Sequence, residues 1–98
     1  MTSVLHESSA GVGRITLNRP DRMNAITVDL GEELERAILA LGDDPAVNAI
    51  LIRGAGGNFC AGGDFSEVER LRSDGPAKLR TLFSAFRCAC DAISEVDV

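Results

Sequence analysis

Apolar and polar positions alternate along residues 12–18, and this alternation predicts a half-buried β-strand. Ile15 and Leu17 fall on one face, whereas Arg14 and Thr16 fall on the other, because successive side chains of a strand point to opposite sides. A second short strand is expected over residues 3–7, separated from the first by turn-forming residues. The two strands are expected to pair as a hairpin.

The pattern changes to helical spacing after Thr27. Thr27 is suited to cap the helix, Asp29 lies in its first turn, and Gly42 ends it. The apolar residues at helical spacing are Leu30, Leu34, Ala37, Ile38 and Leu41. A continuous apolar run then predicts a buried strand over residues 47–53. Strand, helix and strand of these lengths form a parallel crossover unit, so the strands at 12–18 and 47–53 should be parallel neighbours.

Two further helices are expected in the second half of the chain. Asp64 followed by Glu67 has the spacing of a capping box at a helix start. Glu67 and Glu69 are expected on that helix's surface. Residues 73–76 are turn-forming and separate this helix from the next one. The next, long helix should carry an apolar stripe consisting of Leu79, Leu82, Phe83, Phe86, Cys90 and Ile93.

The glycine-rich segment from Gly54 to Asp64 carries the candidate chemistry. It stands between a strand and a helix, where backbone N–H groups lie unpaired at the positive end of the helix dipole. Such a turn can hold an anion or an oxygen that gains negative charge. Phe59 stands where a dinucleotide fingerprint needs its third glycine, and Gly63 with Asp64 replaces the Lys-Ser/Thr pair of a phosphate loop. A plain tight turn remains the alternative.

Charge and composition narrow the classes of partner. The 98 residues are 45% hydrophobic and carry a net charge of −5, which disfavours nucleic acid and anionic membranes. No apolar run is long enough to span a membrane, and the N-terminus lacks the pattern of a secretory signal. The odd number of cysteines fits a reducing cytoplasm, and one histidine makes a zinc site unexpected. Cys60 is interpreted as a small buried side chain rather than a nucleophile.

Two segments in order resemble the crotonase family, also called the enoyl-CoA hydratase/isomerase family. Residues 15–26, Ile-Thr-Leu-Asn-Arg-Pro-Asp-Arg-Met-Asn-Ala-Ile, are similar to the family's I-T-L-N-R-P-x-x-x-N-A pattern, and residues 59–65, Phe-Cys-Ala-Gly-Gly-Asp-Phe, are similar to F-x-A-G-x-D. The resemblance implies an α/β fold, the crotonase-like spiral core cut short: a β-hairpin, a βαβ unit and a C-terminal helix. Residues 1–98 would then be the N-terminal part of a single crotonase-like domain. The second oxyanion donor and the catalytic carboxylates would lie beyond Val98.

The resemblance also implies a substrate and a set of contacts. Family members bind acyl-CoA thioesters and stabilise an enolate-like oxyanion, so the N–H of Gly63 would be a catalytic donor. The implied substrate-binding residues are Arg22, Met23, Ala25, Ala61, Gly63, Asp64 and Phe65. No metal and no separate cofactor are implied, because coenzyme A enters as part of the substrate. Simpler interpretations remain: a solvated charge for Arg22, a turn former for Asn24 and a helix cap for Asp64.

Three functional hypotheses follow from the resemblance. The first is part of an enoyl-CoA hydratase or isomerase (a lyase) of fatty-acid or related acyl-CoA metabolism, inactive as this chain alone. The second is a non-catalytic fragment that binds coenzyme A or supports oligomerisation. The third is another reaction of the family, such as hydrolysis, decarboxylation or ring formation. The complete protein would be a cytoplasmic homotrimer or hexamer.

Overall fold

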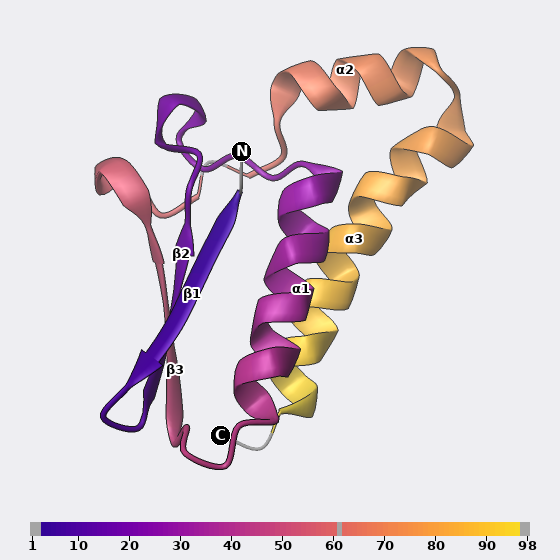
Figure 1. Cartoon of the computed structure of the whole chain (residues 1–98). Coiled ribbons are helices and arrows are strands. Elements are labelled where there is room, and N and C mark those ends of the chain that lie inside the picture. The colour runs from indigo at the N-terminus through magenta and orange to yellow at the C-terminus, as the bar shows by residue number, and fades with distance from the viewer. Residues whose placement is uncertain (1–2, 61, 97–98) are drawn as a thin grey trace.

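The computed structural model describes residues 3–60 and 62–96 and contains one three-stranded sheet with helices on one face (Figure 1). β1 (Val4–Ser9) pairs antiparallel with β2 (Val12–Leu17), which confirms the predicted hairpin. β3 (Ala49–Gly54) runs parallel to β2, as the crossover pattern predicted. Val47 is buried but precedes β3, which begins two residues later than expected. The prediction of a buried strand is wrong, because every residue of β3 is half-buried or exposed: in the described sheet β3 is an edge strand that pairs with β2 alone.

The helix α1 (Val28–Gly42) crosses one face of the sheet (Figure 1). Thr27 caps it as predicted, because its Oγ1 accepts the N–H of Leu30 at 3.1 Å. The helix buries one face against the strands, where Ile15 and Leu17 are almost fully covered. The buried residues of the helix are Leu30, Gly31, Leu34, Ala37, Ile38 and Leu41. The predicted apolar stripe therefore forms the centre of the core.

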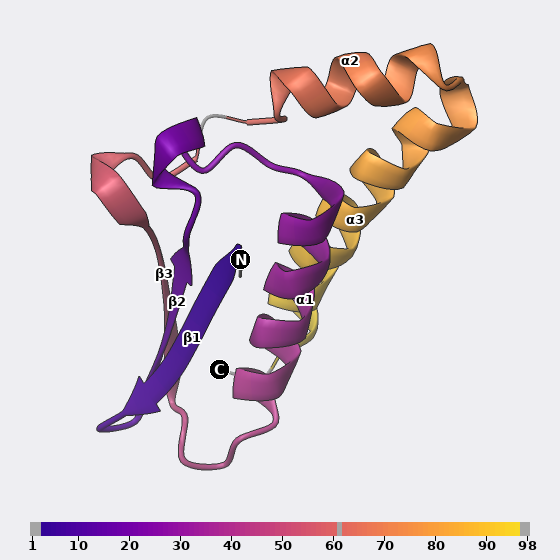
Figure 2. The same cartoon turned by 45° about the horizontal axis from the view of Figure 1, so that its top comes forward.

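Two more helices follow the sheet. α2 (Phe65–Ser73) projects from the end of the sheet at which β3 finishes, and α3 (Pro76–Glu95) returns beside α1, on the side of α1 that faces away from β1 (Figures 1 and 2). Gly31 allows this close approach, because a Cβ built on it would lie 3.1 Å from the Cβ of Ala85. The helices therefore meet through small residues.

The apolar stripe expected on α3 is only partly the face that packs. The buried residues of α3 are Leu82, Ala85, Ala89 and Ala92. Phe83, Phe86 and Ile93 are 60%, 43% and 51% exposed. The alanines face inward because their small side chains let α3 approach α1 closely, and these three larger side chains of the stripe remain outside the buried core.

Candidate functional site

Two loops meet at the carboxyl ends of β2 and β3. The first runs from Asn18 to Thr27 and contains the short 3-10 helix η1 (Pro20–Arg22), and the second contains η2 (Ala55–Gly57) and the glycines before α2. The N–H of Ile26 donates to the carbonyl of Gly62 at 2.6 Å, and the N–H of Asp64 donates to the carbonyl of Ile26 at 2.8 Å. This parallel bridge holds the two sequence motifs side by side. The C-terminal ends of parallel strands are where α/β proteins place ligands.

Asn24 fastens the first loop to the second. It is fully buried, and its Oδ1 accepts the N–H of Arg19 at 2.8 Å. Its Nδ2 donates to the carbonyls of Ala55 at 2.9 Å and Asn58 at 2.7 Å. The interpretation of Asn24 as a turn former is correct, but the same amide also satisfies two carbonyls of the glycine-rich loop.

Arg19 makes a second link between the loops. Its Nη2 lies 3.1 Å from Oδ2 of Asp64, and its Nη1 donates to the carbonyl of Ala25 at 2.6 Å. Burial by itself would raise the pKa of Asp64, but the N–H of Glu67 and the guanidinium of Arg19 outweigh burial and lower that pKa. Arg19 is not among the predicted site residues, although its place inside the first motif could have pointed to it.

Only one of the two hydrogen bonds of the predicted capping box forms at Asp64. Oδ1 of Asp64 accepts the N–H of Glu67 at 3.0 Å, which confirms the cap. The carboxylate of Glu67 does not return to the N–H of Asp64, because that N–H is already bonded to Ile26. Instead Glu67 accepts the N–H of Val28 at 3.3 Å, and its side chain is 14% exposed. The expectation of a helix-surface residue is therefore wrong for Glu67, whereas Glu69 is 52% exposed.

Gly63 presents its N–H away from this network. Its neighbours Gly62 and Asp64 both bond to Ile26, so the alternation of a β-ladder turns the N–H of Gly63 to the opposite side. This N–H has no acceptor within residues 3–60 and 62–96. Gly62 has φ 93°, which favours glycine, whereas Gly63 lies outside that left-handed region. A Cβ on Gly63 would meet only Cγ2 of Val68 at 3.5 Å.

Gly63 lies at the junction of two cavities. One has a volume of about 360 Å³ and is lined by Asp21, Arg22, Met23, Ala25, Gly63, Asp64, Phe65 and Ser66. The structure thus brings together every predicted substrate-binding residue except Ala61, which lies outside the described residues. Asp21 and Ser66 also line this cavity and were not predicted, although each is adjacent in sequence to a predicted residue. The other cavity, of about 250 Å³, is apolar and is lined by Ile26, Gly62, Gly63, Leu82, Phe83 and Phe86.

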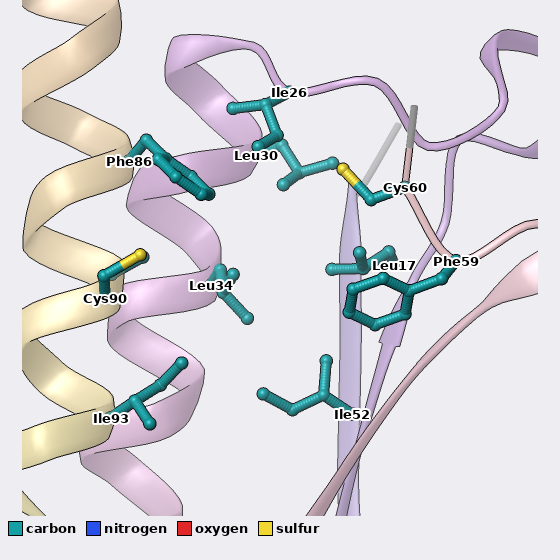
Figure 3. A pocket seen from close by; sticks show the side chains of 11 residues that line it. Leu17, Ile26, Leu30, Leu34, Ile52, Phe59, Cys60, Phe86, Cys90 and Ile93 are labelled. Carbon is teal, nitrogen blue, oxygen red and sulfur yellow. The ribbon is translucent and has the colours of Figure 1, made fainter. Parts of the chain in front are cut away.

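A third cavity, of about 170 Å³, adjoins the second through Ile26 and Phe86. Figure 3 shows Phe86, Cys90 and Ile93 of α3 facing the cavity opposite a wall formed by Leu17, Ile52 and Phe59. Cys60 lines this cavity, is half-buried rather than buried, and accepts the N–H of Gly62 at 3.4 Å. The three cysteines are free thiols.

The described residues contain no cluster of three or more metal-ligating side chains. Among the helices that the structure describes, none has the length and apolar character to cross a membrane.

The sheet, its helices and the two bridged loops define a protein of the crotonase fold. A family model for enoyl-CoA hydratase/isomerase matches residues 12–96, and the chain belongs to this family. The solved structure named Pseudomonas aeruginosa AtuE is 39% identical and superposes with a TM-score of 0.86, covering 96% of this chain and 36% of that one.

Two curated relatives illustrate the range of named activities. A 3-hydroxyisobutyryl-CoA hydrolase 1 of Arabidopsis thaliana is 37% identical over 78 residues, which is 80% of this chain and 21% of that protein. A protein of Mycobacterium tuberculosis with the name "Probable enoyl-CoA hydratase EchA14" is 44% identical over 71 residues, which is 72% of this chain and 27% of that protein. The chain thus spans about a fifth to a quarter of these relatives' length.

Proposed function

We propose that this chain binds an acyl-CoA thioester across the junction of its two cavities, with the N–H of Gly63 bonded to the thioester oxygen. One observation carries this proposal: Gly63 lines both cavities while its N–H has no acceptor among the described residues. An unpaired backbone donor fixed by its neighbours can meet developing negative charge without reorganising. One such donor is worth about 3–4 kcal/mol of reaction barrier.

The two cavities suit the two ends of such a ligand. Arg22 lies on the larger cavity and is exposed, so it can meet phosphate groups in a chain that is acidic overall. Met23 and Phe65 on the same cavity are 54% and 77% exposed and offer apolar surface to the pantetheine arm. The smaller cavity has apolar side chains and would take the acyl group. Coenzyme A is then part of the substrate, and no resident cofactor is required.

The reaction we propose for the complete protein is that of an enoyl-CoA hydratase or isomerase in fatty-acid or related acyl-CoA metabolism. Hydrolysis is the second candidate, favoured by the hydrolase relative, because a thioester oxygen gains charge in both reactions. A decarboxylase, a ring-forming synthase and a non-catalytic module that binds coenzyme A or supports oligomerisation remain the alternatives. A cytoplasmic homotrimer or hexamer is the assembly that we propose for the complete protein.

The two described carboxylates nearest to Gly63 in sequence, those of Asp64 and Glu67, are both committed to other partners. Asp64 is held by Arg19 and by the helix start, and both oxygens of Glu67 are bonded. Asp21 lines the larger cavity and is exposed to solvent. We therefore expect binding without turnover from residues 1–98. Hydration of crotonyl-CoA above the buffer rate would show that this chain holds a complete site.

The binding test compares two ligands that differ in one oxygen. Calorimetry should show butyryl-CoA binding about 2- to 10-fold more tightly than S-butyl-CoA, a thioether without the carbonyl oxygen, since one neutral hydrogen bond is worth about 0.5–1.5 kcal/mol. Gly63→Pro should abolish this preference because it removes the N–H, and Gly63→Ala should keep it. Equal affinities in the unsubstituted chain, or no binding of either ligand, would overturn the proposal.

A further inference from the structure

We infer that Glu67 is a positioning residue for the N–H of Gly63, an inference that rests on the function proposed above. Glu67 lies in the first turn of α2, four residues after Gly63. Its side chain is largely buried and reaches out of its own helix to the first turn of α1. It thereby connects the two helices that follow the two site loops.

The connection begins at the N-terminus of α1. Val28 is the first residue of that helix, and its N–H has no partner within the helix. Oε2 of Glu67 accepts this N–H at 3.3 Å. The carboxylate therefore lies at the starts of two helices, where both dipoles favour negative charge.

The connection continues to Gly63 through Ile26. Val28 is two residues after Ile26, and Ile26 bonds through its N–H to Gly62 and through its carbonyl to Asp64. These two bonds fix the backbone on either side of Gly63 and so set the direction of its N–H. Arg19 holds the carbonyl of Ala25, on the other side of Ile26, at 2.6 Å. Glu67 completes the restraint from the side that Arg19 does not reach.

Glu67 acts through this restraint and not on the ligand. Its Oε1 is 3.2 Å from Nη2 of Arg70, and its Oε2 is used by Val28. Neither cavity at Gly63 is lined by Glu67, whereas its neighbours Phe65 and Ser66 do line the larger one. Glu67 therefore lies outside both cavities, where it can orient the N–H of Gly63 without touching a bound thioester.

Two substitutions separate the effect of the length of the Glu67 side chain from the effect of its charge. Glu67→Asp keeps the charge but shortens the side chain by one methylene, so the carboxylate no longer reaches the N–H of Val28. Glu67→Gln keeps the length and an acceptor oxygen but removes the charge. Glu69→Asp is the matched control, because Glu69 makes an i,i+3 ion pair with Arg72 at 3.7 Å, as Glu67 does with Arg70, but is 52% exposed.

The readout is the affinity ratio of butyryl-CoA to S-butyl-CoA, measured by calorimetry on the 98-residue chain. Glu67→Asp should lower this ratio from about 2- to 10-fold toward unity, while the affinity for S-butyl-CoA stays unchanged. Glu67→Gln and Glu69→Asp should keep the ratio. A residue that only stabilises the fold would weaken both ligands together, so an unchanged ratio in Glu67→Asp would overturn the inference. A ratio of unity in the unsubstituted chain would instead reject the proposed function.

Discussion

The guanidinium of Arg19 and the carboxylate of Asp64 lie 3.1 Å apart, with side chains that are only 20% and 8% exposed. Arg19 follows β2, whereas Asp64 caps α2, so this ion pair joins the two motifs across the centre of the site. The same carboxylate accepts the N–H of Glu67 with its other oxygen. One side chain thus serves both as a helix cap and as a link between loops.

Replacing Asp64 by asparagine should remove the charge and keep the cap, because asparagine is an equally good N-cap residue. We expect a loss of about 1.5–3 kcal/mol in the free energy of unfolding near neutral pH, which is what a hydrogen bond to a charged group contributes. The folded-state pKa of Asp64 is below its ordinary value of 3.8. The carboxylate therefore stabilises the fold above that ordinary pKa, and its contribution is lost as pH falls through the lowered folded-state pKa.

Urea unfolding from about pH 7 down to about pH 3 measures this contribution. The difference in unfolding free energy between the unsubstituted chain and Asp64→Asn should shrink on acidification. Asp91→Asn is the control, because Asp91 is 61% exposed and its pair with Arg87 is long at 3.8 Å. The same change at this exposed pair should have little effect at either pH. A pH-independent difference for Asp64→Asn would show that the ion pair is not the source of the stability.

Removing the amide of Asn24 should be among the more damaging polar substitutions. Asn24→Ala leaves the carbonyls of Ala55 and Asn58 and the N–H of Arg19 without their partner. Each unsatisfied buried group costs about 1–3 kcal/mol, less what water recovers, so we expect a loss of at least about 2 kcal/mol in unfolding free energy. Chemical denaturation measures the loss. Asn48→Ala, at an exposed amide, is the control and should change the stability by less than about 0.5 kcal/mol.

The elements of the fold could be predicted because each has a local pattern. The alternation at 12–18 and the cap at Thr27 are properties of neighbouring residues, and both correspond to structure. The apolar run at 47–53 correctly predicts the strand β3 but not its burial, because burial depends on what covers the strand. The inward face of α3 could not be predicted in the same way, since it depends on how closely α1 approaches. Gly31 permits that approach, and the alanines rather than the phenylalanines then fill the contact.

The candidate site could likewise be predicted only in part from local patterns. The lining of the larger cavity follows from two motifs, and the residues predicted from them lie together. The restraints behind the lining involve partners distant in sequence, such as Arg19 with Asp64 and Glu67 with Val28. No spacing rule links residues so far apart. The capping-box pattern even suggested the wrong partner for Glu67. It assigns the N–H of Asp64 to the Glu67 carboxylate, but the carbonyl of Ile26 accepts that N–H instead.

Two glycines of the second loop should respond in opposite ways to alanine. A Cβ on Gly54 would collide with the carbonyl of Asn58, would approach the carbonyl of Phe59 to 2.5 Å and would lie 2.7 Å from Nδ2 of Asn24. Backbone carbonyls cannot give way without opening the loop, so Gly54→Ala should cost about 3 kcal/mol or more of unfolding free energy.

Gly63→Ala is the matched change, because its Cβ would make only an ordinary contact with Val68 at 3.5 Å and Gly63 lies outside the left-handed region. It should alter the unfolding free energy by less than about 0.5 kcal/mol. Parallel urea denaturation of the two variants gives the comparison. The contrast follows because Gly54 packs against the chain itself, whereas Gly63 faces the cavities that we assign to the ligand. Equal stability of the two variants would mean that the glycine-rich loop is not held in the conformation described.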